Sequence, residues 1–131
     1  MIVQFAADVP PPSRRLIRQT ANRLSRKWGF TDYELHVDLK TDDKTMAEIE
    51  RHVSSRILNL HLSANRLDPE MLRRDLFHEF WHVATWRLAD WLETVLALLS
   101  KRRRRQIESD IRREFEAAHE DAVQLWLKEL T

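Results

Sequence analysis

The sequence of 131 residues contains no cysteine and a single glycine, Gly29. Without cysteine the chain can form no disulfide, and it cannot build the cysteine-based zinc ribbons that accompany some zinc enzymes. One glycine leaves few positions for tight glycine turns, which favours a fold with much helix. Basic and acidic residues nearly balance at 22 and 21, so the chain as a whole is not a binder of polyanions.

Long apolar runs free of charge are also missing. The stretch 76–99 is rich in Leu and Trp, yet it carries too many ionisable groups for a membrane span. These groups are His78, Glu79, His82, Arg87, Asp90 and Glu93. The first 15 residues lack the basic segment and apolar run of a secretory signal. We therefore expect a water-soluble cytoplasmic protein without membrane contacts, folded as one domain over residues 1–131.

Hydrophobic periodicity predicts an α+β fold in which a small, mostly antiparallel sheet packs on helices. After a rigid proline spacer at 10–12, Ser13 is expected to cap a first helix that ends at Gly29. Apolar residues that alternate with polar ones predict the strands. The expected strands cover residues 2–5, 33–39, 47–52 and 56–62, of which the third could instead be a short helix.

Two long helices are expected in the C-terminal half. Asp68-Pro69-Glu70 combines a capping side chain, a proline at the first turn and an acid near the positive pole. The helix that follows should run to about Ser100, either unbroken or bent once near 87–90. The last helix should cover about 106–130. The two are expected to form a long hairpin joined near Lys101–Arg105, whose cations suit the negative pole of a helix end.

The chemistry is concentrated in the pattern His-Glu-x-x-His at residues 78–82. Two histidines four positions apart lie on one face of a helix, so both rings can converge on one Zn²⁺ at about 2.0–2.1 Å. Glu79 follows the first histidine and is predicted to be the general base for a zinc-bound water. His78 and His82 then need a third protein ligand from elsewhere. The alternative is that both are hydrogen-bonded histidines on a Trp-rich helix.

The order of these segments resembles that of the zincin metallopeptidases. A strand RILNLHLS, a cap DPE, a helix LRRDLFHEFWH and a later acidic helix follow one another within residues 33–130. The chain is most similar to minimal phage- or prophage-associated members such as the ImmA/IrrE-like glutamate-zincins. The resemblance implies hydrolysis of a protein or peptide substrate, which would add as a strand to a sheet edge formed by 56–62. One departure is that LADWLETVLALL continues the metal helix, which in this family usually ends at a glycine.

The third zinc ligand is expected from the last helix, where Glu116, His119 and Glu120 lie within one turn. Periodicity favours His119, because it projects near the middle of the apolar face. The resemblance instead implies Glu120, because the glutamate ligand of the ImmA/IrrE-like pattern is followed by a small apolar residue, an amide and a bulky apolar residue. The matching residues are Val123, Gln124 and Trp126. We take Glu120 as the predicted ligand, with His119 next and Glu116 last.

Three functions are compatible with these patterns. In a peptidase, Glu79 moves the proton while zinc polarises the carbonyl. A non-hydrolytic, zinc-stabilised phage-type accessory protein would use the Leu/Trp-rich helix as an interface, but it would not need a free carboxylate beside the metal. A DNA-associated peptidase similar to the SprT-like group would place Lys101–Arg105 on nucleic acid or another acidic partner. The missing cysteines count against that third function, and a zinc-dependent metallopeptidase is therefore the prediction.

Overall fold

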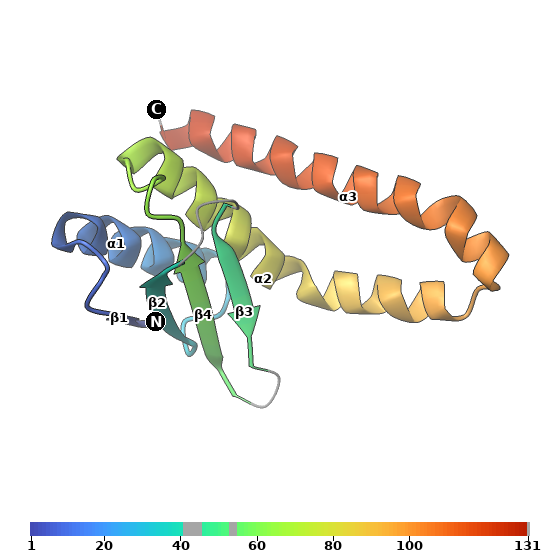
Figure 1. Ribbon diagram of the computed structural model, residues 1–131, viewed down its shortest axis with the longest axis horizontal. Coiled ribbons are helices and arrows are strands. Elements are labelled where there is room, and N and C mark those ends of the chain that lie inside the picture. The colour runs from blue at the N-terminus through green and yellow to red at the C-terminus, as the bar shows by residue number, and fades with distance from the viewer. Residues whose placement is uncertain (41–45, 53–54, 131) are drawn as a thin grey trace. The chain divides into compact units, whose positions relative to one another are not determined.

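The computed structural model describes residues 1–40, 46–52 and 55–130, which form four strands and three helices (Figure 1). The helices contain 18, 29 and 30 residues, more than half of the chain, so the α+β class is confirmed. None of these helices combines the length and apolar character needed to cross a bilayer. The elements are β1 (Ile2–Phe5), α1 (Pro11–Trp28), β2 (Glu34–Leu39), β3 (Glu48–Arg51), β4 (Ile57–Leu62), α2 (Pro69–Ala97) and α3 (Lys101–Leu130).

The chain divides into two compact units, Met1–Phe80 and Trp81–Thr131. The first contains the whole sheet, α1 and the first turns of α2, and the second contains the rest of α2 and all of α3. The helix α2 passes through the boundary without interruption.

The four strands form a mixed sheet in the order β1-β2-β4-β3. β1 pairs with β2 and β2 with β4 in parallel, and only β3 and β4 pair antiparallel. The expectation of a mostly antiparallel sheet is therefore wrong. The reason is the connection through α1, which returns the chain to the end of the sheet where β1 began, so that β2 must run parallel to it. The short link between β3 and β4 leaves only that pair antiparallel.

β4 lies inside the sheet, between β2 and β3. The strand at 56–62 is thus not the sheet edge that the family resemblance implied, and the edge strands are β1 and β3. Burial explains this order: Leu58, Leu60 and Leu62 of β4 are at most 1% exposed, as a central strand requires, whereas β3 alternates between exposed and half-buried residues. Within the segment 47–52, residues Glu48–Arg51 form a strand, as first expected, and not a short helix.

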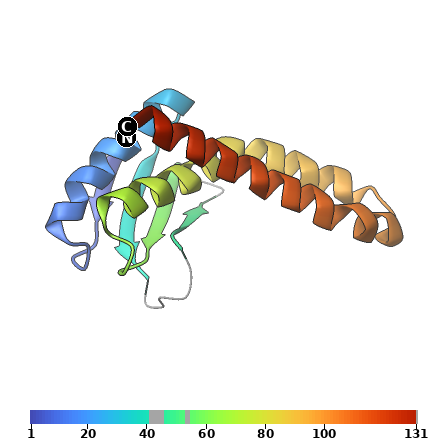
Figure 2. The same cartoon turned by 90° about the horizontal axis from the view of Figure 1, so that it is seen from above.

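The core of residues 1–80 is formed where helices cover one face of this sheet (Figures 1 and 2). Leu35 and Val37 of β2 are buried beside the leucines of β4, while the residues between them are only half-buried. Aromatic rings join the helices to this core, with centroids of Trp28 and Phe77 5.3 Å apart. The helices contribute the fully buried side chains Ile17, Ala21 and Leu24 from α1 and Leu76 and Phe80 from α2.

α1 begins earlier and ends where expected. Its first helical residue is Pro11, and Pro10 precedes it in an extended conformation without any side-chain cap. The predicted spacer at 10–12 and the cap at Ser13 are therefore wrong, because proline is well suited to the first helical turn, where no backbone N–H is needed. Gly29 ends the helix in the left-handed conformation with φ 80°, as predicted.

α2 starts as the sequence indicated, with the Met71 N–H donating to Asp68 Oδ2 at 3.1 Å. It continues unbroken through 87–90 and ends at Ala97, three residues before the expected end. α3 begins at Lys101 and not near Gln106, so Lys101–Arg105 form its first turn. These cations thus lie at the positive pole of α3, where the dipole disfavours them, and the prediction that they suit a helix end is wrong in sign for α3.

Ion pairs offset part of that cost in residues 81–131. Arg104 donates to Glu108 Oε2 at 2.8 Å and to Glu93 Oε2 at 3.2 Å, and Arg112 donates to both glutamates. Glu93 is near the end of α2, so these pairs join the end of α2 to the beginning of α3. The longer hairpin that would include all of residues 69–130 stays a prediction.

Candidate metal centre

His78 and His82 project from one side of α2. The helix has no break between Pro69 and Ala97, so the spacing of four residues places the two rings one turn apart. Both side chains are half-buried. The position of His78 beside His82 is thus set by the continuous helix that carries them, as the sequence predicted.

α3 brings a third imidazole to His82. The His119 side chain is 1% exposed, and its ring centroid lies 4.3 Å from that of His82 and 6.1 Å from that of Trp81. Phe115, one turn earlier on α3, contacts the His119 ring at 5.2 Å. These apolar rings shield the imidazole from water, which raises the effective strength of any bond that it makes to a cation.

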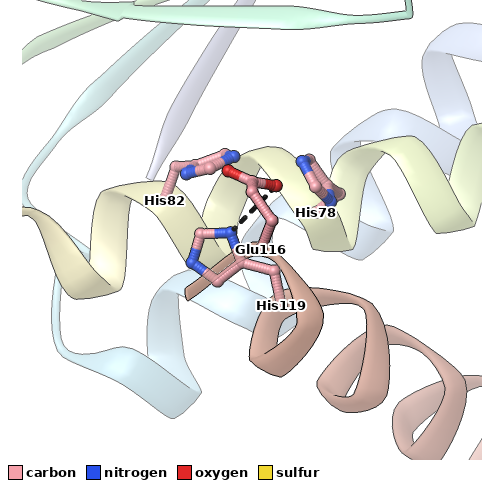
Figure 3. Close-up of side chains that lie close together, drawn as sticks. All are labelled: His78, His82, Glu116 and His119. Carbon is pink, nitrogen blue, oxygen red and sulfur yellow. Dashed lines mark ion pairs between the residues drawn. The ribbon is translucent and has the colours of Figure 1, made fainter. Parts of the chain in front are cut away.

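Glu116 is the acidic member of the group. It lies three residues before His119 on α3, its side chain is exposed, and its Oε2 is 4.0 Å from His119 Nδ1 (Figure 3). One ligand atom from each of four residues lies within 4.8 Å of the other three. The four residues are His78, His82, Glu116 and His119.

The donor set fits a zinc ion in kind. Three imidazole nitrogens and one carboxylate oxygen are ligands that zinc prefers, whereas calcium and magnesium prefer oxygen ligands alone. Two donors that each bind zinc at about 2.1 Å lie at most about 4.2 Å apart. In a tetrahedral site such donors lie about 3.4 Å apart. The ligand atoms, which lie within 4.8 Å of one another, must therefore move closer by up to about 1.4 Å when the metal binds.

Glu79 lies outside this donor group. Its side chain is 7% exposed, and its Oε2 accepts a hydrogen bond of 3.0 Å from the Ile49 backbone N–H on the edge strand β3. Burial raises the pKa of the Glu79 carboxyl to about 7. The charges of Asp75 and Glu48 raise it further, against the lowering effects of the Ile49 hydrogen bond and of Lys40.

Glu120 is also outside the donor group. It is exposed on α3 and accepts a hydrogen bond of 2.9 Å from Gln124 Nε2. Of the three candidates on α3, His119 is the one whose ring contacts that of His82, with centroids 4.3 Å apart.

Glu116 was the last of the three candidates in the sequence, although a signal for it was present. Glu116 and His119 are three residues apart, and this spacing places both side chains on the same face of a helix. A glutamate and a histidine in this spacing can bind one metal from a single helix. A search for acid–histidine pairs at helical spacing would have ranked Glu116 with His119.

Comparison of the chain with protein-family models, with curated proteins and with solved structures gave no match in any of the three.

Proposed function

We propose that the chain is a zinc-dependent peptidase-type domain in which His78, His82 and His119 bind the metal. One observation carries the proposal: the two histidines of the His-Glu-x-x-His pattern on α2 and two residues of α3 have ligand atoms within 4.8 Å of one another. His119 takes the place of Glu120 as third ligand, because Glu120 is outside the donor group. When bound, zinc supplies a Lewis acid that polarises a carbonyl and lowers the pKa of water.

Glu79 is the proposed general base. It follows the first ligand histidine, and one of its carboxylate oxygens is held by the Ile49 N–H. A hydrogen bond from a backbone amide fixes the orientation of the carboxylate, so its second oxygen can take up a proton and return it without a large rearrangement. Ile49 is therefore a positioning residue through its main chain.

The substrate class in this proposal is a protein or peptide, and the expected cytoplasmic location belongs to the same proposal. So does the long hairpin of α2 and α3 as the scaffold of the site. The basis is that peptide hydrolysis needs a Lewis acid, a base and a free coordination position. In this proposal Glu116 does not bind the metal, so the fourth coordination position stays open. Its side chain is exposed and can turn toward solvent.

One observation favours a second function, that of a non-hydrolytic protein stabilised by zinc. Three histidines and Glu116 would complete a tetrahedral site, and structural zinc sites are closed in this way. In that case Glu79 would serve only to hold α2 to β3 through Ile49. The two functions differ in what Glu116 and Glu79 must do, and this difference can be measured.

The test is Glu79→Gln, which keeps the size of the side chain and removes its ability to accept a proton. In the peptidase, zinc content stays near that of the wild type and cleavage of denatured casein falls by at least about a hundredfold. Zinc is measured by elemental analysis and cleavage by mass spectrometry of the products.

The matched control is Glu70→Gln, an exposed glutamate in the first turn of the same helix. It should keep both zinc and cleavage. Glu120→Ala should keep zinc, whereas His119→Ala should lose most of it. Equal cleavage by wild type and Glu79→Gln would disprove the base. Zinc without cleavage in any variant, together with zinc loss in Glu116→Ala, would establish the closed site.

A further inference from the structure

α1 has a large excess of positive charge, whereas the chain as a whole is almost neutral. Its 18 residues include six cations and no acid, although the whole chain has a net charge of only +1. The cations are Arg14, Arg15, Arg18, Arg23, Arg26 and Lys27. A local excess of this size produces a positive surface potential that a net charge near zero conceals.

Not all six cations are available to a partner. Arg14 donates to the carbonyl oxygen of Val9, and the guanidinium groups of Arg14 and Arg18 lie 5.7 and 5.2 Å from the ring centroid of Phe5. The other four cations are exposed, and none of them forms an ion pair with any residue that the structure describes. They are Arg15, Arg23, Arg26 and Lys27.

These four cations occupy one face of α1. At about 100° per residue they fall within an arc of about 120°, and they span about 18 Å of helix axis. The exposed amide of Gln19 lies inside the same arc. The residues buried against the sheet, among them Ile17 and Leu24, are on the other side of the helix. We name this stripe of Arg15, Gln19, Arg23, Arg26 and Lys27 the α1 stripe.

We propose that the α1 stripe binds the phosphate backbone of duplex DNA. Arginine is the side chain best suited to phosphate, since its planar fork makes paired hydrogen bonds. A length of about 18 Å corresponds to about five base pairs. The major groove of B-form DNA admits a helix, and an amide such as Gln19 can bond to base edges there. The groove of A-form RNA is too narrow for that contact.

Two other kinds of partner fit the α1 stripe less well. A membrane surface requires an apolar helix face that can enter the lipid, and the apolar residues of α1 are already buried in the core of residues 1–80. A protein interface requires apolar or aromatic anchors at its centre, and the α1 stripe contains none. The basic first turn of α3 is a weaker candidate than the α1 stripe for binding DNA phosphates, because Arg104 there is held by Glu93 and Glu108.

The test is the triple variant Arg15→Gln, Arg23→Gln and Arg26→Gln of the full chain. Its affinity for a fluorescent duplex of about 20 base pairs is measured by anisotropy between about 50 and 200 mM salt. Loss of three phosphate contacts should weaken binding more than about tenfold and reduce the salt slope by about 2.7. Glutamine is a good helix former, so α1 should persist, which circular dichroism checks.

The control is Lys101→Gln, Arg102→Gln and Arg103→Gln, which removes the same charge from α3 and should bind nearly as wild type. Binding should also survive removal of zinc by a chelator, which separates this proposal from the peptidase. The proposal is overturned if the wild type does not bind the duplex or if both triple variants weaken equally. It is equally overturned if poly-glutamate or single-stranded RNA of the same charge binds as tightly as the duplex.

Discussion

The two compact units of the chain are stabilised by different means. Residues 1–80 have a sheet whose inner leucines are fully buried under α1 and the start of α2. Among the side chains of residues 81–131 that the structure describes, few apolar ones are buried: Val83, Leu96, Val123 and Trp126. That unit leaves Leu88, Trp91, Leu98 and Leu125 between 51% and 83% exposed. The comparison indicates that burial of apolar side chains contributes more to the stability of the first unit than to that of the second.

The largest effect should come from the core of the first unit. Leu60 lies in β4 between two neighbouring strands and is 0% exposed. Leu60→Ala removes buried methyl groups and leaves a cavity, so we expect the free energy of unfolding to fall by about 2–5 kcal/mol. Urea unfolding followed by far-ultraviolet circular dichroism measures the change.

The matched change in the other unit is Leu125→Ala on α3, where the leucine is 63% exposed. It should lower the free energy of unfolding by less than about 0.5 kcal/mol, because little apolar surface is lost. Equal losses in the two variants would show that the second unit has a core of its own and would remove the contrast between the units.

Zinc binding should raise the free energy of unfolding by an intermediate amount. The increase should be confined to the second unit and the turn of α2 that precedes it. At a free concentration about a hundredfold above the dissociation constant, a ligand of the folded state adds about 2.7 kcal/mol. Hydrogen exchange should therefore slow in residues 101–126 on addition of zinc and change little in β4. His82→Ala should abolish the response, because it removes one nitrogen donor.

The control for that measurement is His52→Ala, an exposed histidine of the first unit that bonds to Asn59. It should leave the zinc response of residues 101–126 unchanged. Equal slowing of exchange in both units would mean that metal binding is coupled to folding across the whole chain. That result would contradict the expectation that zinc stabilises mainly the second unit.

The smallest effect should come from the ion pairs of Glu108. Hydrogen bonds from Arg104 and Arg112 lower the pKa of the Glu108 carboxyl to about 2. A depressed carboxyl pKa stabilises the fold above the usual value of about 4.5, and this contribution disappears as the pH falls toward about 2. Glu108→Gln should therefore melt slightly below the wild type at about pH 6, and the difference should vanish near pH 2.

Glu114→Gln provides the comparison, since Glu114 is exposed on the same helix. Its melting temperature should follow that of the wild type at every pH. High salt should also shrink the Glu108 difference, because exposed pairs are screened. A difference for Glu108 that persisted at about pH 2 and high salt would mean that the side chain acts through packing and not through charge.

The sequence by itself determined the features that depend on neighbours along the chain. The cap at Asp68, the left-handed Gly29 and the alternation in β2 and β4 all follow from local backbone preferences. The spacing of His78 and His82 fixed their common face, because a helix of any context repeats every 3.6 residues. The α+β class follows from these local elements in the same way.

Only the tertiary structure decided which distant segments meet. Periodicity identifies the face that a strand buries, but it does not say which strand lies beside it, so the parallel pairings and the interior place of β4 were missed. For the same reason the sequence left Glu116, His119 and Glu120 as alternatives. They share one helical turn, and a rotation of α3 by one residue changes which of them points at His82. The packing of Phe115 and Trp81 around His119 fixes that rotation.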